Sequence, residues 1–222
     1  MHVGFESSIL NRSMTGVANY TFNIVRCAME LEPGLRFAGF RDLDWRAFSL
    51  ADAREISRLH DKQGDGPKST RMSAGRLSSR ILDGAARLPG SRMAAAMYRA
   101  ARRQRFAASV RGQSLDLFHA FNFRPLADPG VPTLPVIYDL STFRHPEFHP
   151  RDRVKWLEPL RAFVAQAPLV HTISDFSKRE IADVFGYPLE RIFVAPPAAS
   201  SLFAPLGREK TQPALDALGL TY

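Results

Sequence analysis

The alternation of short apolar runs with longer amphipathic runs is the feature that most constrains this chain. Short runs that are apolar nearly throughout predict strands that are buried on both faces, and the longer periodic runs between them predict helices. This order predicts an α/β domain, doubly wound, with a Rossmann-like parallel sheet and helices on both faces. The predicted strands are 2–6, 36–40, 115–121, 134–138, 169–173 and 191–195, and the predicted helices are 17–31, 93–108, 151–165 and 174–185.

The length and composition fit a globular protein with a substantial core. The chain has 222 residues, of which 45% are hydrophobic, and its 16 Phe supply bulky core material. A lone Cys27 excludes a disulfide framework, so a reducing compartment is expected. No apolar run is long enough for a membrane span, and residues 1–6 do not have the pattern of a signal peptide, so we expect neither.

The positive charge is confined to one part of the sequence. Thirty Lys and Arg against 22 Asp and Glu give a net charge of +8. Segment 62–111 holds twelve of the basic residues and only two acidic ones, Asp65 and Asp83, so it carries +10 and the rest of the chain carries −2. This segment, rather than the whole molecule, calls for an anionic partner.

Within segment 62–111, an apolar stripe at helical spacing runs beside Arg76, Arg80 and Arg87. The apolar positions are Leu77, Ile81, Ala85 and Leu88. The basic amphipathic helix has three interpretations: a solvated face on a core, a surface that lies on anionic lipid headgroups, or a nucleic-acid contact. Nucleic acid is the least favoured, because no interleaved aromatic residues and no recognisable nucleic-acid-binding motif accompany the charge.

Ligands of doubly wound domains bind beyond the carboxyl ends of the strands, so the loops there are the candidate site. Thr15 and Gly16 precede the first predicted helix, where a Gly lets backbone approach a phosphate. Tyr138 and Asp139 end another strand, and Ser174 follows the next and can cap a helix. The dinucleotide fingerprint is absent, so no nicotinamide cofactor is expected.

A metal centre is not expected either. His145 and His149 lie close together in sequence, but Pro146 and Pro150 oppose a helix that would place both imidazoles on one face. No Cys and His cluster has the spacing of zinc ligands. We therefore predict no metal and no cofactor.

Three segments together resemble the N-terminal domain of family 4 retaining glycosyltransferases of the GT-B type. The segments are His171 to Pro196, Ile137 to Pro150, and Ser13 to Tyr20, and they occur in the family's order. The second segment is similar to the mannosyltransferase-like branch that serves bacterial lipopolysaccharide O-antigen assembly. The resemblance spans nearly the whole chain, with segment 62–111 its least family-specific part.

The resemblance implies roles for the loop residues. The donor, a GDP- or UDP-linked sugar, would lie between two domains, with backbone of Thr15 and Gly16 approaching its phosphates. Tyr138 and Asp139 would face the reacting sugar or the acceptor, and Asn122 and Ser174 are further candidates on the acceptor side. The expected partners are the nucleotide-sugar, a lipid-linked saccharide and an anionic membrane surface touched by Arg76, Arg80 and Arg87, which predicts a cytoplasmic protein on the inner face of the membrane.

The chain departs from the family at three points. Tyr138 stands where many members have His, and Pro197 and Ala198 replace the usual Asn and Gly. The family's second domain, with its paired Glu residues, would follow the last strand, so residues 1–210 are expected to be the acceptor domain and 211–222 a linker toward a missing C-terminal domain. Such a chain should be inactive alone. The alternatives are a non-catalytic domain of the same fold that binds anionic lipid, and a basic nucleic-acid-binding module.

Overall fold

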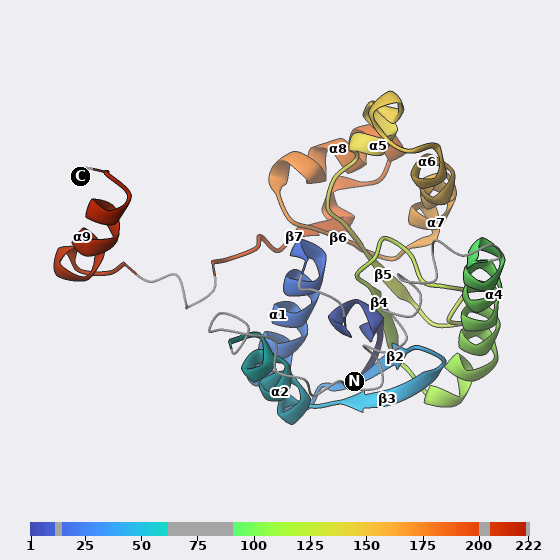
Figure 1. The fold of residues 1–222 in the computed structure, drawn as a ribbon. Coiled ribbons are helices and arrows are strands. Elements are labelled where there is room, and N and C mark those ends of the chain that lie inside the picture. The colour runs from blue at the N-terminus through green and yellow to red at the C-terminus, as the bar shows by residue number, and fades with distance from the viewer. Residues whose placement is uncertain (12–14, 62–90, 200–204, 221–222) are drawn as a thin grey trace.

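The protein folds around one twisted sheet (Figure 1). The structure, a computed structural model, describes residues 1–11, 15–61, 91–199 and 205–220. Within these, seven strands pair in the order β3-β2-β1-β4-β5-β6-β7, and every pair is parallel except β2 with β3. The doubly wound α/β prediction is confirmed. The strands are β1 His2–Glu6, β2 Arg36–Arg41, β3 Asp44–Phe48, β4 Leu117–Ala120, β5 Thr133–Ile137, β6 Val170–Thr172 and β7 Ile192–Val194.

Helices connect the strands and cover the sheet. The α-helices are α1 Gly16–Leu31, α2 Leu50–Asp61, α4 Ser91–Ser109, α5 Ser141–Arg144, α6 Arg151–Leu157, α7 Leu160–Gln166, α8 Asp175–Phe185 and α9 Arg208–Ala217. Short 3₁₀ turns occupy Ser7–Asn11, Val110–Gln113, Pro146–Phe148 and Leu189–Arg191. Figure 1 shows α1 and α2 on one side of the strands and α4 on the other.

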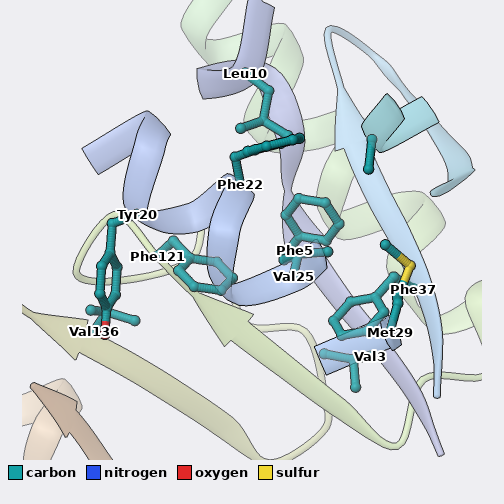
Figure 2. Close-up of a cluster of buried hydrophobic side chains, with 11 residues drawn as sticks. Val3, Phe5, Leu10, Tyr20, Phe22, Val25, Met29, Phe37, Phe121 and Val136 are labelled. Atoms are coloured by element: carbon teal, nitrogen blue, oxygen red, sulfur yellow. The ribbon is translucent and has the colours of Figure 1, made fainter. Parts of the chain in front are cut away.

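The face under α1 and α2 is built from alternate strand residues. Val3 and Phe5 of β1 point to this face, as the two-residue period of a strand requires. The Phe5 ring is fully buried and meets Phe37, Phe48 and Phe121 edge to face, with centroids 5.4 to 6.2 Å apart. Figure 2 shows Phe5 and Phe37 beside Val25 and Met29, which come from α1. This cluster fixes α1 over the centre of the sheet.

The opposite face is divided between α4 and the later helices. Phe106 of α4 is fully buried and packs on Phe40, Trp45 and Phe118, whose ring centroids lie 5.2 to 5.5 Å from its own. A second cluster, around Ile137 of β5, gathers apolar residues of α6, α7 and α8. Because the inner strands are apolar nearly throughout, both faces of the sheet are apolar, and both are covered.

The hairpin partner β3 and the helix α2 have no counterpart among the predicted elements. Asp42 takes a left-handed φ of 56° in the two-residue turn between β2 and β3, a conformation that Asp tolerates better than most residues. The start of α2 is marked by Ser49 and Asp52, each of whose side chains accepts the other's backbone N–H. That reciprocal pattern is a capping box, and it is visible in the sequence.

The single helix predicted over 151–165 is wrong, because the chain breaks after Leu157 into α6 and α7. Pro159 lacks the backbone N–H that a continuous helix needs, so a new helix starts at Leu160. The predicted boundary at residue 210 falls inside α9. The amphipathic helix with Arg76, Arg80 and Arg87 lies outside the described residues.

The Phe106 cluster predicts a large stability cost for one substitution. Phe106→Ala should lower the free energy of unfolding by about 3 to 5 kcal/mol, because a cavity would open between α4 and three aromatic rings. Urea unfolding measures the change. The control is Phe148→Ala, since Phe148 is 77% exposed and should change stability by less than about 0.5 kcal/mol. Equal losses in both variants would contradict the packing described for α4.

Candidate functional site

The sheet has a topological switch point between β1 and β4. The chain runs from β1 outward to β2 in one direction and later returns to place β4 on the other side of β1. Loops leaving β1 and β4 therefore diverge, and the crevice outside their carboxyl ends is where such sheets bind ligands. Residues 7–16 follow β1 and residues 121–132 follow β4. The switch point thus places Thr15, Gly16 and Asn122 at one edge of the sheet.

Thr15 and Gly16 form the start of α1. Thr15 is the N-cap, and its Oγ1 accepts the N–H of Ala18 at 3.4 Å. The N–H groups of Gly16 and Val17 precede the first intrahelical bond, and no described residue accepts a hydrogen bond from them. A Cβ added at Gly16 would meet no described atom within 4 Å. Within the described residues, the helix start therefore has backbone donors without an acceptor, which suit an anion.

Tyr138 is partly buried, and its phenol proton is committed inside the protein. The hydroxyl donates to the backbone oxygen of Phe121 at 2.8 Å, and the ring packs edge to face on Tyr20 and Phe123. Burial raises the pKa of Tyr138 well above its usual range. The phenol thus ties the end of β5 to the end of β4, and its role toward a sugar stays a prediction.

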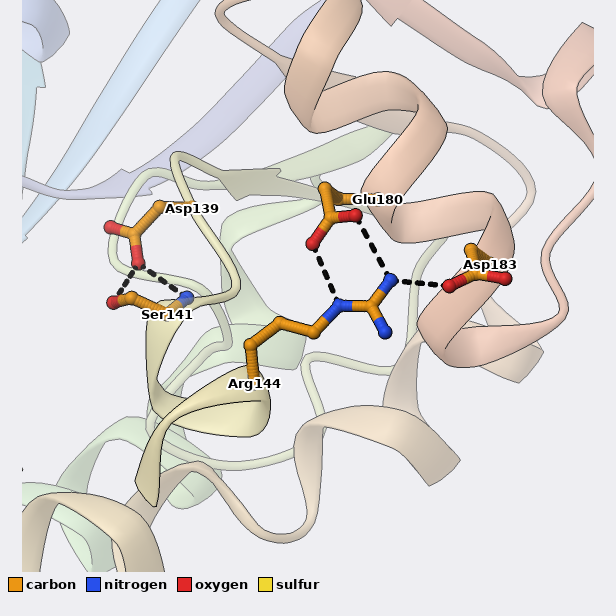
Figure 3. Close-up of polar contacts among 5 residues, drawn as sticks. All are labelled: Asp139, Ser141, Arg144, Glu180 and Asp183. Carbon is orange, nitrogen blue, oxygen red and sulfur yellow. Dashed lines mark hydrogen bonds and ion pairs between the residues drawn. The ribbon is translucent and has the colours of Figure 1, made fainter. Parts of the chain in front are cut away.

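Asp139 is exposed, next to Tyr138 at the carboxyl end of β5. Its carboxylate accepts the backbone N–H and the hydroxyl of Ser141 at 3.0 and 2.5 Å, which holds the first turn of α5 (Figure 3). At the other end of α5, Arg144 donates to Glu180 and Asp183 of α8. The hydrogen bonds from Arg144 to Glu180 lower the pKa of that carboxyl group. The loop after β5 is therefore held at both ends, with one carboxylate oxygen of Asp139 facing outward from these bonds.

Asn122 follows β4 in a strained turn. The next residue, Phe123, is buried and has a left-handed φ of 64°, which is costly for a bulky side chain. Its ring packs against Tyr138 and Trp156, and the backbone N–H of Arg124 bonds back to the oxygen of Asn122 at 2.7 Å. The packing of Phe123 thus forces the turn that places Asn122 at the edge of the sheet.

Ser174 caps α8 as the sequence indicates. Its Oγ accepts the N–H of Ser177 at 3.1 Å, and the Ser177 hydroxyl donates to the backbone oxygen of Tyr138 at 2.9 Å. Ser174, Tyr138 and the end of β4 are therefore joined by consecutive bonds. Thr15 and Gly16 join this group through α1, whose Tyr20 ring lies against Tyr138.

A buried polar chain that the sequence analysis missed connects α1, β4, β6 and the segment after β7. The Tyr20 hydroxyl lies 2.6 Å from Nε2 of His171 and 2.5 Å from the backbone oxygen of Ala195. Nδ1 of His171 lies 3.0 Å from Nε2 of His119. The histidines stack on Phe121 and Phe193, with centroids 3.9 and 4.6 Å apart. The sequence offered one signal for this network: His119 and His171 each stand inside a short run that is otherwise mostly apolar.

The protons of this chain can be assigned from donor and acceptor capacity. The Ala195 carbonyl can only accept, so the single Tyr20 proton goes to it and the Tyr20 oxygen accepts from His171 Nε2–H. Neutral His171 then accepts at Nδ1, which makes His119 the donor through Nε2–H. One proton order satisfies all three bonds, and it requires the His171 imidazole to be neutral because that ring must accept at Nδ1.

Burial opposes charge on every member of this chain. It lowers the pKa of His171 to about 4, and burial together with the charge of His171 lowers the pKa of His119 to about 3. Burial also raises the pKa of Tyr20 to about 12, so the phenol keeps its proton. The hydrogen-bonded network of Tyr20, His171 and His119 is therefore neutral. It holds Ala195, the residue after β7, at the carboxyl edge of the sheet.

The described residues contain neither a candidate metal centre nor a candidate membrane-spanning helix. Among these, no group of three or more His, Cys, Asp or Glu could hold a metal ion. In the same part of the chain, no helix is both long and apolar enough to cross a bilayer. The proposed membrane contacts Arg76, Arg80 and Arg87 fall outside it.

The buried histidines predict a loss of stability in mild acid. In the unfolded chain they bind protons near pH 6.5, whereas in the folded chain they do so only near pH 4 and 3, so folding is favoured above pH 6.5 and weakens as pH falls. Each contributes up to about 1.4 kcal/mol per pH unit. Urea unfolding between pH 7 and 5 measures the slope, which His171→Gln should reduce.

Exposed His145 supplies the matched control. His145→Gln should leave the pH slope at its original value, because that side chain is solvent-exposed. A slope that is the same in the original protein and in His171→Gln would contradict the neutral buried chain.

The amino-acid sequence is similar to that of a known protein. No protein-family model matches the chain. The chain is 27% identical to O-antigen chain mannosyltransferase B of Escherichia coli over 226 aligned residues, which cover 100% of this chain and 54% of the relative. The chain thus spans about half the length of the curated relative that it matches. The similarity supports a relationship to glycosyltransferases that extends over every element of the sheet.

Proposed function

We propose that this chain is the acceptor-side domain of a retaining, family 4, GT-B glycosyltransferase. It helps to move a mannose-like hexose from a GDP- or UDP-linked donor to a lipid-linked saccharide in cell-surface polysaccharide synthesis. The observation that carries the proposal is the similarity of the whole chain to about half of an O-antigen chain mannosyltransferase, over a domain whose switch point carries backbone donors without a described acceptor. A second domain would supply the nucleotide-sugar site.

The geometry supports a division of labour at the edge of the sheet. The N–H groups of Gly16 and Val17, which have no acceptor among the described residues, and the positive end of the α1 dipole suit the diphosphate of the donor, which becomes the leaving group. Asp139 is the exposed carboxylate nearest to the end of β5, so it suits a hydroxyl of the sugar or acceptor. Asn122 and Ser174 flank it from the neighbouring strands.

Sugar transfer tests this proposal. Transfer from GDP-mannose or a UDP-hexose to a lipid-linked oligosaccharide is measured for the 222-residue chain alone and for the product of the whole reading frame. We expect transfer only when a donor-binding domain is present. Transfer by the 222-residue chain would overturn its acceptor-side assignment, and a whole product that transfers no sugar would overturn the enzyme assignment.

Gly16→Ala sharpens this test within the active protein. The new Cβ contacts no described atom, so folding should be unchanged, but it would stand where the donor phosphates approach. We expect the KM for the donor to rise about tenfold, the scale of one lost hydrogen bond to a charged group. Gly207→Ala is the control, because a Cβ there also meets nothing within 4 Å.

We also propose that the protein is peripheral on the inner, cytoplasmic face of the membrane, and α4 supports this. Phe106 marks the buried side of α4, and the residues on the opposite side are exposed and almost wholly apolar. That outward face comprises Met93, Ala94, Met97, Ala100, Ala101, Gln104 and Ala108. Exposed Arg103 and Arg105 border it on either side, an arrangement typical of helices that lie in an anionic lipid interface.

The outward face of α4 makes the lipid-binding function separately testable. Met93→Glu/Met97→Glu should lower sedimentation with phosphatidylglycerol vesicles about tenfold, since both side chains are more than half exposed at 68% and 66%. Neutral phosphatidylcholine vesicles should bind weakly. The control is Leu31→Glu/Phe148→Glu, at residues 84% and 77% exposed elsewhere on the surface. Equal losses in both double variants would remove α4 as the membrane contact.

A further inference from the structure

The turn after β4 carries Arg124, a partly buried arginine that has no carboxylate partner among the described residues. Arg124 donates through Nη2 to the backbone oxygen of Trp156 in α6 at 3.2 Å, and its Cζ lies 5.5 Å from the Trp156 ring centroid. Its Nε is buried and has no hydrogen-bond partner among the described residues. A buried donor without an acceptor is costly, so this atom calls for an explanation.

Two further arginines surround the same place. Cζ of Arg153, on α6, lies 5.9 Å from the centroid of Phe123, and the Phe123 and Trp156 rings meet edge to face at 6.0 Å. Arg124 and Arg153 therefore rest on the two rings of one aromatic pair. Arg103 of α4 approaches near enough to repel Arg124 electrostatically. None of these three guanidiniums forms an ion pair with a described carboxylate.

The fold keeps these three arginines together despite electrostatic repulsion and backbone strain. Burial and the charge of Arg103 lower the pKa of Arg124, so both disfavour the charged guanidinium. The backbone of Phe123, which precedes it, is held in a strained left-handed conformation. Backbone strain and a group of like charges that persist together are typical of binding sites, where a ligand supplies the missing opposite charge.

We propose that Arg124, with Arg103 and Arg153, binds the phosphate groups of the lipid-linked acceptor. The planar guanidinium of Arg124 suits hydrogen bonding to phosphate oxygens, and a dianionic group would offset its repulsion from Arg103. The site lies two residues after Asn122, so a phosphate here would leave the saccharide end of the acceptor at the carboxyl edge of the sheet. The acceptor assignment rests on the proposed function, whereas phosphate binding itself does not.

Pyrophosphate binding tests the site without any transferase assay. Titration calorimetry and thermal unfolding are measured with inorganic pyrophosphate at constant ionic strength. We expect saturable binding and a raised Tm for the original protein. Arg124→Lys keeps the charge but loses the planar guanidinium, and it should weaken binding about tenfold or more, as should Arg153→Gln.

Matched controls distinguish pyrophosphate binding at this site from nonspecific attraction to the positive charge of the protein. Arg54→Gln and Arg179→Gln remove exposed arginines of α2 and α8 and should leave pyrophosphate affinity unchanged. Equal weakening in these controls and in Arg124→Lys would overturn the proposal, as would the absence of any saturable binding. The Tm of each ligand-free variant reports whether it has folded.

A second arm distinguishes the two sources of phosphate. Phosphatidylglycerol vesicles present headgroup phosphates, whereas pyrophosphate represents the diphosphate of the acceptor. We expect Arg124→Lys to weaken pyrophosphate binding and to leave vesicle binding within twofold. Loss of vesicle binding without any effect on pyrophosphate would assign the cluster to headgroups and overturn the acceptor assignment. Pyrophosphate binding by a protein that transfers no sugar would keep the site and reject only the proposed function.

Discussion

The parallel pairing of β1 with both β2 and β4 is the constraint on which the rest of the structure depends. Val3, Gly4 and Phe5 have partners on both sides, so β1 is an inner strand of the sheet, beside the central strand β4. A Cβ at Gly4 would lie 2.4 Å from a side-chain carbon of Leu115, which shows how closely the opposite face is packed. Because the chain winds in both directions from β1, its loops part at one edge, and the candidate site follows from this topology.

The two halves of that edge use polar groups differently. On the α1 side, Tyr20, His171 and His119 satisfy one another in a neutral chain that holds Ala195. On the other side, Phe123 is strained and Arg124 is left with an unsatisfied buried donor. The first arrangement stabilises the point where the chain leaves β7. The second is destabilising by itself, since it combines backbone strain with a buried donor that has no described acceptor.

Strong local patterns made most of the sheet predictable, and tertiary contacts decided the rest. The strands β1, β4 and β5 are buried on both faces, so their sequences are apolar enough to be recognised alone. The edge strand β3 is half exposed, and its residues carry no such run. Its pairing depends on the turn at Asp42 and on contacts with α4, neither of which a residue pattern encodes by itself.

The site was predictable in position but not in detail. Parallel topology alone places Thr15, Tyr138 and Ser174 at one edge of the sheet. It does not say that the Tyr138 proton belongs to the Phe121 carbonyl, since that depends on how the turn after β4 packs. Similarly, His119 and His171 are 52 residues apart in sequence and meet only because β4 and β6 flank β5. Long-range hydrogen bonds set the chemistry, and no short motif reports them.

The arginines of the positively charged segment show how structural and binding roles can be separated by their partners. Arg102 of α4 is only 15% exposed at its side chain, yet it donates to Glu6 at 2.7 Å, to Ser8 and to the Asp42 carbonyl. Its charge is therefore compensated within the fold. Arg103, one position later, is exposed, and its charge acts on Arg124, whose own guanidinium has no carboxylate among its described partners. Adjacent residues of one helix thus divide between holding the domain together and attracting an anion to its edge.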